Sequence, residues 1–185
     1  MKTIIGQFVF IKDEFLDKYF PPIKTAGGKI HNINHGKGRP FFYVFDETED
    51  LAWVVPVSSD KSGKKHEKYN EYLNKATKEK PNWIALGKVD DVDSVFNLSG
   101  MFPVPKNMID HIYYSKRYKF YPISKIEGAK IITLAKKYKA QNEINTEYNL
   151  DEIIKSPYKE ILKDYYKSKD KNHQKEFASK NDLEL

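Results

Sequence analysis

Short hydrophobic runs near the start of the chain predict two elements before a long loop. The segment from Thr3 to Ile11 is apolar and rich in β-branched residues, which predicts a strand. Apolar residues recur at helical spacing over 14–20, and Pro21-Pro22 ends the helix that this spacing predicts. From there to Pro40 the chain is rich in Gly and His, which indicates a loop.

The next two hydrophobic runs have the pattern of a β-hairpin. Residues 41–45 and 51–57 are aromatic and β-branched, and the polar residues 46–50 join them. A second polar loop follows Ser58. A Lys-rich stretch over 66–78 then has only a thin apolar face, which makes it a weakly predicted helix.

Two further runs complete the predicted sheet. Residues 83–89 and 94–104 are both strand-like, and the acidic segment 90–93 between them predicts a turn. The count is therefore five or six strands before residue 105. Short strands joined by long loops favour a compact, strongly curved antiparallel sheet or barrel over a parallel doubly wound sheet.

The second half of the chain has the periodicity of helices. Apolar residues recur every three or four positions over 123–138, and a similar stripe begins at Leu150. Ser156-Pro157 fits the start of a last helix that carries Ile161, Leu162 and Tyr165. We therefore predict an α+β fold in one domain, 1–167, with a β-rich core over 3–105, a helical part over 106–167 and a flexible tail over 168–185.

Composition excludes several classes of protein. The 185 residues include no cysteine, which excludes disulfide scaffolds, thiolate metal sites and Cys nucleophiles. No apolar run approaches the roughly 20 residues needed to span a bilayer. Residues 1–11 have neither the apolar region nor the cleavage site of a signal peptide. These features predict a cytoplasmic protein that does not bind a membrane.

The net charge of +6 is concentrated in one stretch. Between residues 101 and 150, Lys and Arg outnumber Asp and Glu by nine to four, a difference of five. Within it, the segment 113–121 interleaves Lys116, Arg117 and Lys119 with aromatic residues. This composition can pair phosphates with cations and stack unpaired bases on rings, so Lys116 and Arg117 are predicted RNA contacts. The alternative is an amphipathic connection whose rings belong to the core.

Metal and cofactor sites find little support in the sequence. Neither glycine-rich phosphate-binding motif is present, and the five histidines are scattered. His31 and His35 are four apart, but no carboxylate lies beside them in the chain. The acidic segment 90–93 lacks the later Gly and Glu of a calcium loop, so it is interpreted as a solvated turn. We predict no metal and no cofactor.

The end of the second hairpin strand carries the candidate chemistry. Ser58 and Ser59 supply hydroxyls, and Lys61 supplies an ammonium two residues later. Such groups can converge on the phosphate of an RNA bond, whose cleavage needs no metal when the 2′-hydroxyl is the nucleophile. The alternative is a segment selected only for its turn chemistry.

The residues around this strand end resemble a known toxin family. Pro56-Val57-Ser58-Ser59-Asp60-Lys61 and the later Leu98-Ser99-Gly100-Met101-Phe102-Pro103-Val104 are similar to motifs of the ToxN/AbiQ/CptN endoribonuclease toxins of type III toxin–antitoxin systems. The resemblance covers about residues 3–135. It implies a barrel-like sheet with added helices, related to the Kid/MazF ribonucleases. It also assigns Ser58, Ser59 and Lys61 to the family's Thr/Ser, Ser and Lys positions.

The resemblance further implies a reaction and a partner. The reaction is metal-independent cleavage of cellular RNA, which leaves a 2′,3′-cyclic phosphate and a 5′-hydroxyl. The partner is a small antitoxin RNA, which the toxin cuts from a repeat-containing precursor into pseudoknots that then fill the active site in a closed protein–RNA hetero-oligomer. Asp60 occupies the variable position of the motif. A carboxylate there weakens the attraction of Lys61 for an RNA phosphate unless the carboxylate points away.

Five other residues are predicted RNA contacts. Arg39 can hold a phosphate with two hydrogen bonds, and Tyr43 follows it closely in the chain. Lys64 and Lys65 suit phosphates, and the imidazole of His66 suits proton transfer or RNA contact. Each has a structural alternative: a loop cation, a core ring or a solvated charge. The alternative function is a non-catalytic basic RNA-binding module built on 113–121.

Overall fold

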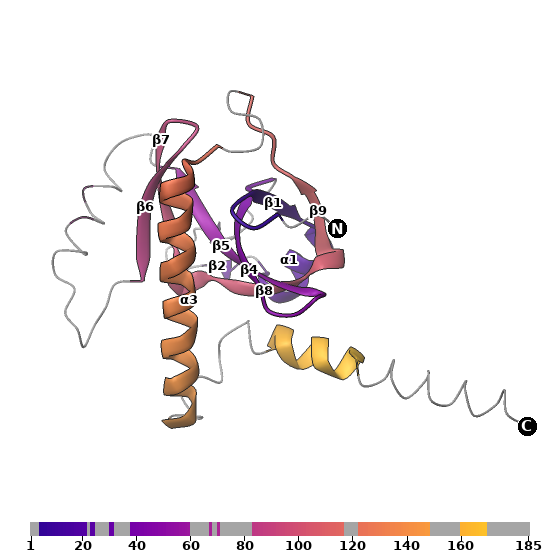
Figure 1. Ribbon diagram of the computed structural model, residues 1–185. Coiled ribbons are helices and arrows are strands. Elements are labelled where there is room, and N and C mark those ends of the chain that lie inside the picture. The colour runs from indigo at the N-terminus through magenta and orange to yellow at the C-terminus, as the bar shows by residue number, and fades with distance from the viewer. Residues whose placement is uncertain are drawn as a thin grey trace, which may run out of the picture.

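A seven-stranded antiparallel sheet with helices on both faces is the framework of the protein (Figure 1). The computed structural model describes residues 4–21, 23–24, 30–31, 38–59, 67, 70, 83–116, 122–148 and 160–169. The strands are β1 (Phe8–Ile11), β2 (Ile23–Lys24), β3 (Ile30–His31), β4 (Phe41–Asp46), β5 (Leu51–Ser59), β6 (Ile84–Val89), β7 (Val92–Asn97), β8 (Phe102–Pro105) and β9 (Ile109–Ile112). The helices are α1 (Asp13–Tyr19), α3 (Lys125–Tyr148) and a helix over 160–169, with single 3-10 turns at Leu98–Gly100 and Lys106–Met108.

The order of the strands confirms the predicted α+β class and the antiparallel sheet. The sheet runs β6-β7-β5-β4-β1-β9, and β8 also pairs with β5; β2 and β3 form a separate two-stranded sheet. Within the described residues, β6 and β9 are the two ends of the path and do not pair, so the sheet is not closed. The barrel-like curvature expected from the sequence stays a prediction.

Strand β5 organises the sheet because it pairs along both of its edges. One edge pairs with β4, as the predicted hairpin requires. The other edge pairs with β8 over 51–54 and with β7 over 57–59. The sequence predicted one strand over 94–104, and this was wrong. Val54 pairs with Phe102 and Val57 with Phe96, so the 3-10 turn at Leu98–Gly100 inserts extra residues and divides the run into two strands.

The acidic turn is shorter than the sequence predicted. Only Asp90 and Asp91 form the turn between β6 and β7, both with positive φ (52° and 63°), and β7 already begins at Val92. Two successive residues with positive φ are typical of the two-residue turns that join twisted antiparallel strands, and Asp tolerates this conformation better than most residues.

Side chains on the two faces of the sheet form two cores. One core packs α1 and the helix at 160–169 against the sheet, through Phe15, Leu16 and Ile161. The other packs α3 against the opposite face, through Ile131 and Ala135, together with Ile123 just before the helix. Lys139 of α3 also forms an ion pair with Glu47 in the hairpin turn at 2.8 Å. Figure 1 shows α3 running along the sheet.

The C-terminal part differs from the sequence prediction in three details. Strand β9 lies at 109–112, where helices were predicted, and pairs with β1. The predicted last helix is confirmed over 160–169, and its buried residues Ile161 and Tyr165 belong to the predicted apolar stripe. Residues 168 and 169, the first two of the predicted tail, continue this helix, and the rest of that tail lies outside the described residues. The start predicted at Ser156-Pro157 and most of the helix predicted over 66–78 lie outside the described residues.

Candidate functional site

A hollow of about 250 Å³ lies where β5 ends. Its polar lining comes from Arg39 before β4, Ser59 at the end of β5, Asp90 in the β6–β7 turn, Ser94 on β7 and Tyr113 just after β9. The register explains two of these positions, because Ser59 pairs directly with Ser94. Apolar residues complete the wall: Phe8, Pro40, Val57, Val89 and Val92. The fold therefore gathers polar groups from four separate parts of the chain around the predicted strand end.

The two serines do not share this hollow. Both belong to β5, where consecutive side chains point to opposite faces. Val57 and Ser59 line the hollow and Ser58 does not. The expectation that both hydroxyls converge on one anion therefore conflicts with the alternation of side chains along β5. Ser59 is the serine that this hollow presents.

Arg39 reaches the hollow from a glycine-dependent bend. Gly38 has a φ of +71°, a left-handed conformation that favours glycine. Arg39 is half-buried, and within the described part of the chain it forms no ion pair. It also lines a second hollow of about 230 Å³ together with Phe10, Lys12 and His111. A guanidinium in this position is available to hold a phosphate.

Asp90 makes a network that the sequence did not reveal. Its carboxylate accepts hydrogen bonds from the hydroxyl of Tyr113, at 2.9 Å, and from that of Ser115. Its backbone N–H donates to the carbonyl of Pro122 at 2.8 Å. Burial raises the pKa of the Tyr113 phenol, and the hydrogen bond to Asp90 raises it further, so the phenol remains protonated at neutral pH. Only the turn pattern of 90–93 hinted at this position, and it was interpreted as solvated.

Tyr43 was wrongly predicted to contact RNA. Its side chain is only 2% exposed and belongs to the core between the sheet and α1. Its hydroxyl donates to Asp46. The core-ring alternative therefore holds for this residue.

The other predicted RNA contacts are only partly described. Lys116 is exposed and follows the buried Ser115. Lys61, Lys64, Lys65, His66 and Arg117 lie outside the described residues, so their predicted roles stay predictions.

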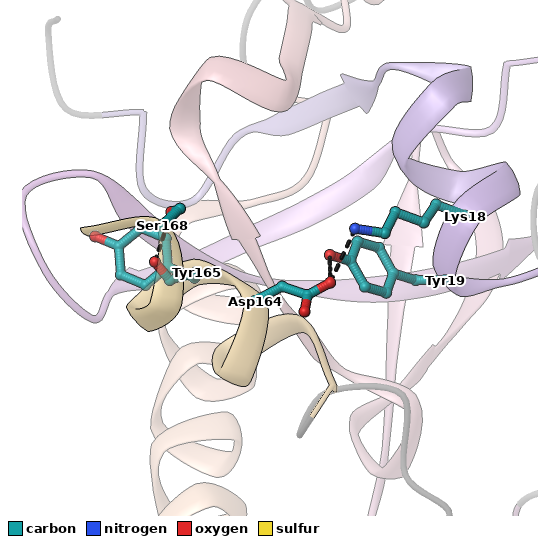
Figure 2. Close-up of polar contacts among 5 residues, drawn as sticks. All are labelled: Lys18, Tyr19, Asp164, Tyr165 and Ser168. Atoms are coloured by element: carbon teal, nitrogen blue, oxygen red, sulfur yellow. Dashed lines mark hydrogen bonds and ion pairs between the residues drawn. The ribbon is translucent and has the colours of Figure 1, made fainter. Parts of the chain in front are cut away.

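A larger cleft of about 660 Å³ lies between α1 and the helix at 160–169. Figure 2 shows its central contact, where Lys18 and Tyr19 both donate to the Asp164 carboxylate at 2.9 Å. On the same helix, Lys169 forms an ion pair with Asp50 at 3.1 Å. These charges bind the helix to the rest of the protein. None of the sequence-predicted site residues lines this cleft.

The second motif of the resemblance has a structural role here. Leu98, Met101, Phe102 and Val104 are all buried, and β8 pairs with the first half of β5. This motif therefore helps to position the strand that ends at Ser59.

Comparison with known proteins does not identify the chain. No protein-family model matches it, and no curated protein matches it either. Among the described residues, no three His, Asp or Glu side chains are grouped closely enough to hold a metal ion. None of the described helices is long and apolar enough to cross a bilayer.

Proposed function

We propose that this protein is an endoribonuclease toxin of the ToxN/AbiQ/CptN type. The observation that carries the proposal is the hollow at the end of β5. It brings together Ser59 and Arg39, which the sequence had separately suggested as phosphate ligands. Lys61, the third residue of the motif, follows Ser59 by two positions in the chain.

The proposed chemistry requires alignment and charge stabilisation. The 2′-oxygen of the RNA bonds to phosphorus while the bond from phosphorus to the 5′-oxygen breaks. One proton leaves the 2′-hydroxyl and another reaches the 5′-oxygen. The products are a 2′,3′-cyclic phosphate and a 5′-hydroxyl. Arg39 and Lys61 offset the extra negative charge of the transition state, and the Ser59 hydroxyl donates to a phosphate oxygen.

The carboxylate of Asp90 lies in the same hollow and opposes phosphate binding by its charge. Two hydroxyl donors, from Tyr113 and Ser115, already occupy it. Hydrogen bonds to a carboxylate disperse its charge, which reduces the repulsion. The Tyr113 phenol therefore acts as a spacer between this acid and a bound phosphate.

The proposed partner is a small antitoxin RNA that the toxin processes and that inhibits it. The resemblance supports this partner, and the net charge of +6 is consistent with a polyanion. A closed assembly of protein and RNA, acting in the cytoplasm, belongs to the same proposal. The alternative function is a non-catalytic RNA-binding module, for which the exposure of Lys116 is the supporting observation.

Serine substitutions test the proposal directly. Ser59→Ala is expected to lower the rate of RNA cleavage by ~10²–10³, the usual loss when one oriented donor to a developing anion is removed. Ser58→Ala is expected to lose less, because its side chain lies on the other face of β5. Ser99→Ala, an exposed serine in the 3-10 turn, is the matched control. Cleavage of a labelled RNA by purified protein measures all three rates.

The non-catalytic alternative predicts a different pattern. If purified wild-type protein binds RNA without cutting it, the endoribonuclease proposal is wrong and the binding module is favoured. Equal rates for Ser59→Ala and Ser99→Ala would show that the hollow at the end of β5 is not the site of chemistry.

A further inference from the structure

A row of aromatic rings leads from the Ser59 hollow to the protein surface. We call it the aromatic strip: Phe8 and Phe10 on β1, His111 on β9 and Tyr113 just after β9. The ring of Phe8 lies 6.3 Å from that of Tyr113, and Tyr113 lies 6.0 Å from Phe10, measured between centroids. Phe10 and His111 are stacked, with centroids 4.4 Å apart and planes 28° apart. The strip is continuous because each ring contacts the next.

Exposure increases along this strip. Phe8 is buried, Phe10 and Tyr113 are half-buried, and the His111 side chain is 60% exposed. Phe10 covers one face of the imidazole, so the exposed surface includes the other face. Asp110 contacts His111 Nδ1 at 2.7 Å and restrains the ring from the side. A ring that is already held in place loses little conformational entropy when a flat partner stacks on it.

Cations border the outer end of the strip. The second hollow, of about 230 Å³, is lined by Lys12 and Arg39 as well as Phe10 and His111. Arg39 also lines the Ser59 hollow, so one guanidinium borders both. Two acids, Asp13 and Asp110, also line the second hollow. Asp110 contacts His111, and Asp13 lies in the first turn of α1, where the helix dipole favours a negative charge.

We propose that the aromatic strip and the second hollow form a stacking subsite for one nucleotide of a single-stranded RNA. The base stacks on the exposed face of His111, and the adjoining phosphate lies between Arg39 and Lys12. Because Arg39 also borders the Ser59 hollow, this nucleotide lies next to the phosphodiester bond that is cut. This assignment rests on the proposed function.

A single strand fits this surface better than a duplex. Aromatic side chains stack on bases whose faces are open, and duplex pairing hides those faces. Cations beside an exposed ring are the usual combination in proteins that bind single strands. The subsite therefore prefers single-stranded RNA to a duplex, and it contacts the flat face of a base.

Binding of a non-cleavable RNA tests the subsite. The probe is a short fluorescein-labelled single strand with 2′-O-methyl groups throughout, which has no nucleophile, and fluorescence anisotropy is read at one fixed pH. His111→Ala is expected to raise Kd about five- to tenfold, the lower part of the range for a base stacked on a side-chain ring. His111→Phe is expected to restore binding, because a ring is retained.

Salt dependence separates stacking from charge. Arg39→Ala is expected to reduce the log-log salt slope by ~0.7, the value for one phosphate contact on a single strand. His111→Ala is expected to leave the slope unchanged, because stacking of a ring on a base releases no counterion. Tyr166→Ala is the matched control, since this ring is 48% exposed on the helix at 160–169 and lines neither hollow.

The outcomes separate the subsite from the nuclease. Unchanged Kd for His111→Ala would overturn the subsite, even if Ser59→Ala abolishes cleavage and the nuclease proposal stands. If the wild-type protein cuts no RNA and His111→Ala binds the probe more weakly than the wild type does, the subsite is supported and the nuclease proposal is overturned. Equal affinity for a duplex of the same sequence, or a reduced salt slope for His111→Ala, would also overturn stacking on a single strand.

Discussion

Tyr43 shows why the role of a single aromatic residue was not predictable from the sequence. It lies on β4, where five successive residues are buried, so both faces of the strand face a core. No alternation of polar and apolar residues distinguishes an inner from an outer face in such a strand. Its hydroxyl donates to Asp46, and Asp46 also forms an ion pair with Lys106 at 2.9 Å.

Tyr43→Phe is expected to destabilise the fold without affecting RNA binding. Removing a hydroxyl that donates to a carboxylate costs about 1–3 kcal/mol in the free energy of unfolding. Urea unfolding measures the loss, and anisotropy with the 2′-O-methyl RNA measures binding. A large rise in Kd for a folded Tyr43→Phe protein would restore the original prediction that Tyr43 contacts RNA.

The site residues were predictable one at a time, and their grouping was not. Ser59 and Arg39 were identified from their chemistry, and the structure places both at one hollow. Asp90 was missed because its role depends on hydroxyls from Tyr113 and Ser115, which lie more than twenty residues away in the chain. Such partners become visible only when the sheet brings the β6–β7 turn beside the end of β9.

At the scale of elements, local patterns predicted the helices and strands that have a clear periodicity of their own. They missed those that depend on pairing with a segment distant in the chain. The β4–β5 hairpin and the helices carry their own periodicity. Strand β9 is only four residues long, IDHI, and its two central residues are exposed. It is a strand because the edge of β1 offers backbone partners to it. No pattern within 106–112 could indicate that pairing.

The helix at 160–169 gives a prediction about pH. The hydrogen bond from Lys18, followed by that from Tyr19, lowers the pKa of the Asp164 carboxyl, and Asp164 in turn raises the pKa of Lys18. A lowered carboxyl pKa stabilises the fold above the unfolded value, near 3.9, and this contribution is lost as the pH falls through the folded value. A raised lysine pKa stabilises the fold below about 10.4.

The contribution of this ion pair is therefore expected to be constant from about pH 5 to pH 10. Asp164→Asn is expected to cost about 0.2–1 kcal/mol in that window, since the Lys18 side chain is 59% exposed and the Asp164 side chain 39%, so solvent screens the pair. Below about pH 4 the difference between the two proteins is expected to shrink. Urea unfolding across this range measures it. A difference that grows on acidification would contradict the assignment of Asp164 as the stabilising partner.

At the scale of the whole molecule, the sequence predicted the class and the fold explains the site. The α+β class and the antiparallel sheet follow from the order of strand-like and helical patterns along the chain. The path of the sheet does not, because it depends on β5 accepting β7 and β8 along one edge. That divided pairing places Ser59 beside the β6–β7 turn, and so creates the hollow in which the chemistry is proposed.

RNA cleavage in excess EDTA, with analysis of the product ends, tests the central claim most directly. We expect purified wild-type protein to cut RNA at an undiminished rate, because side chains alone align the 2′-hydroxyl and offset the charge on phosphorus. The products are expected to carry 2′,3′-cyclic phosphate and 5′-hydroxyl ends. Strict dependence on added magnesium or manganese, or products with 5′-phosphate and 3′-hydroxyl ends, would contradict attack by the 2′-hydroxyl at the Ser59 hollow.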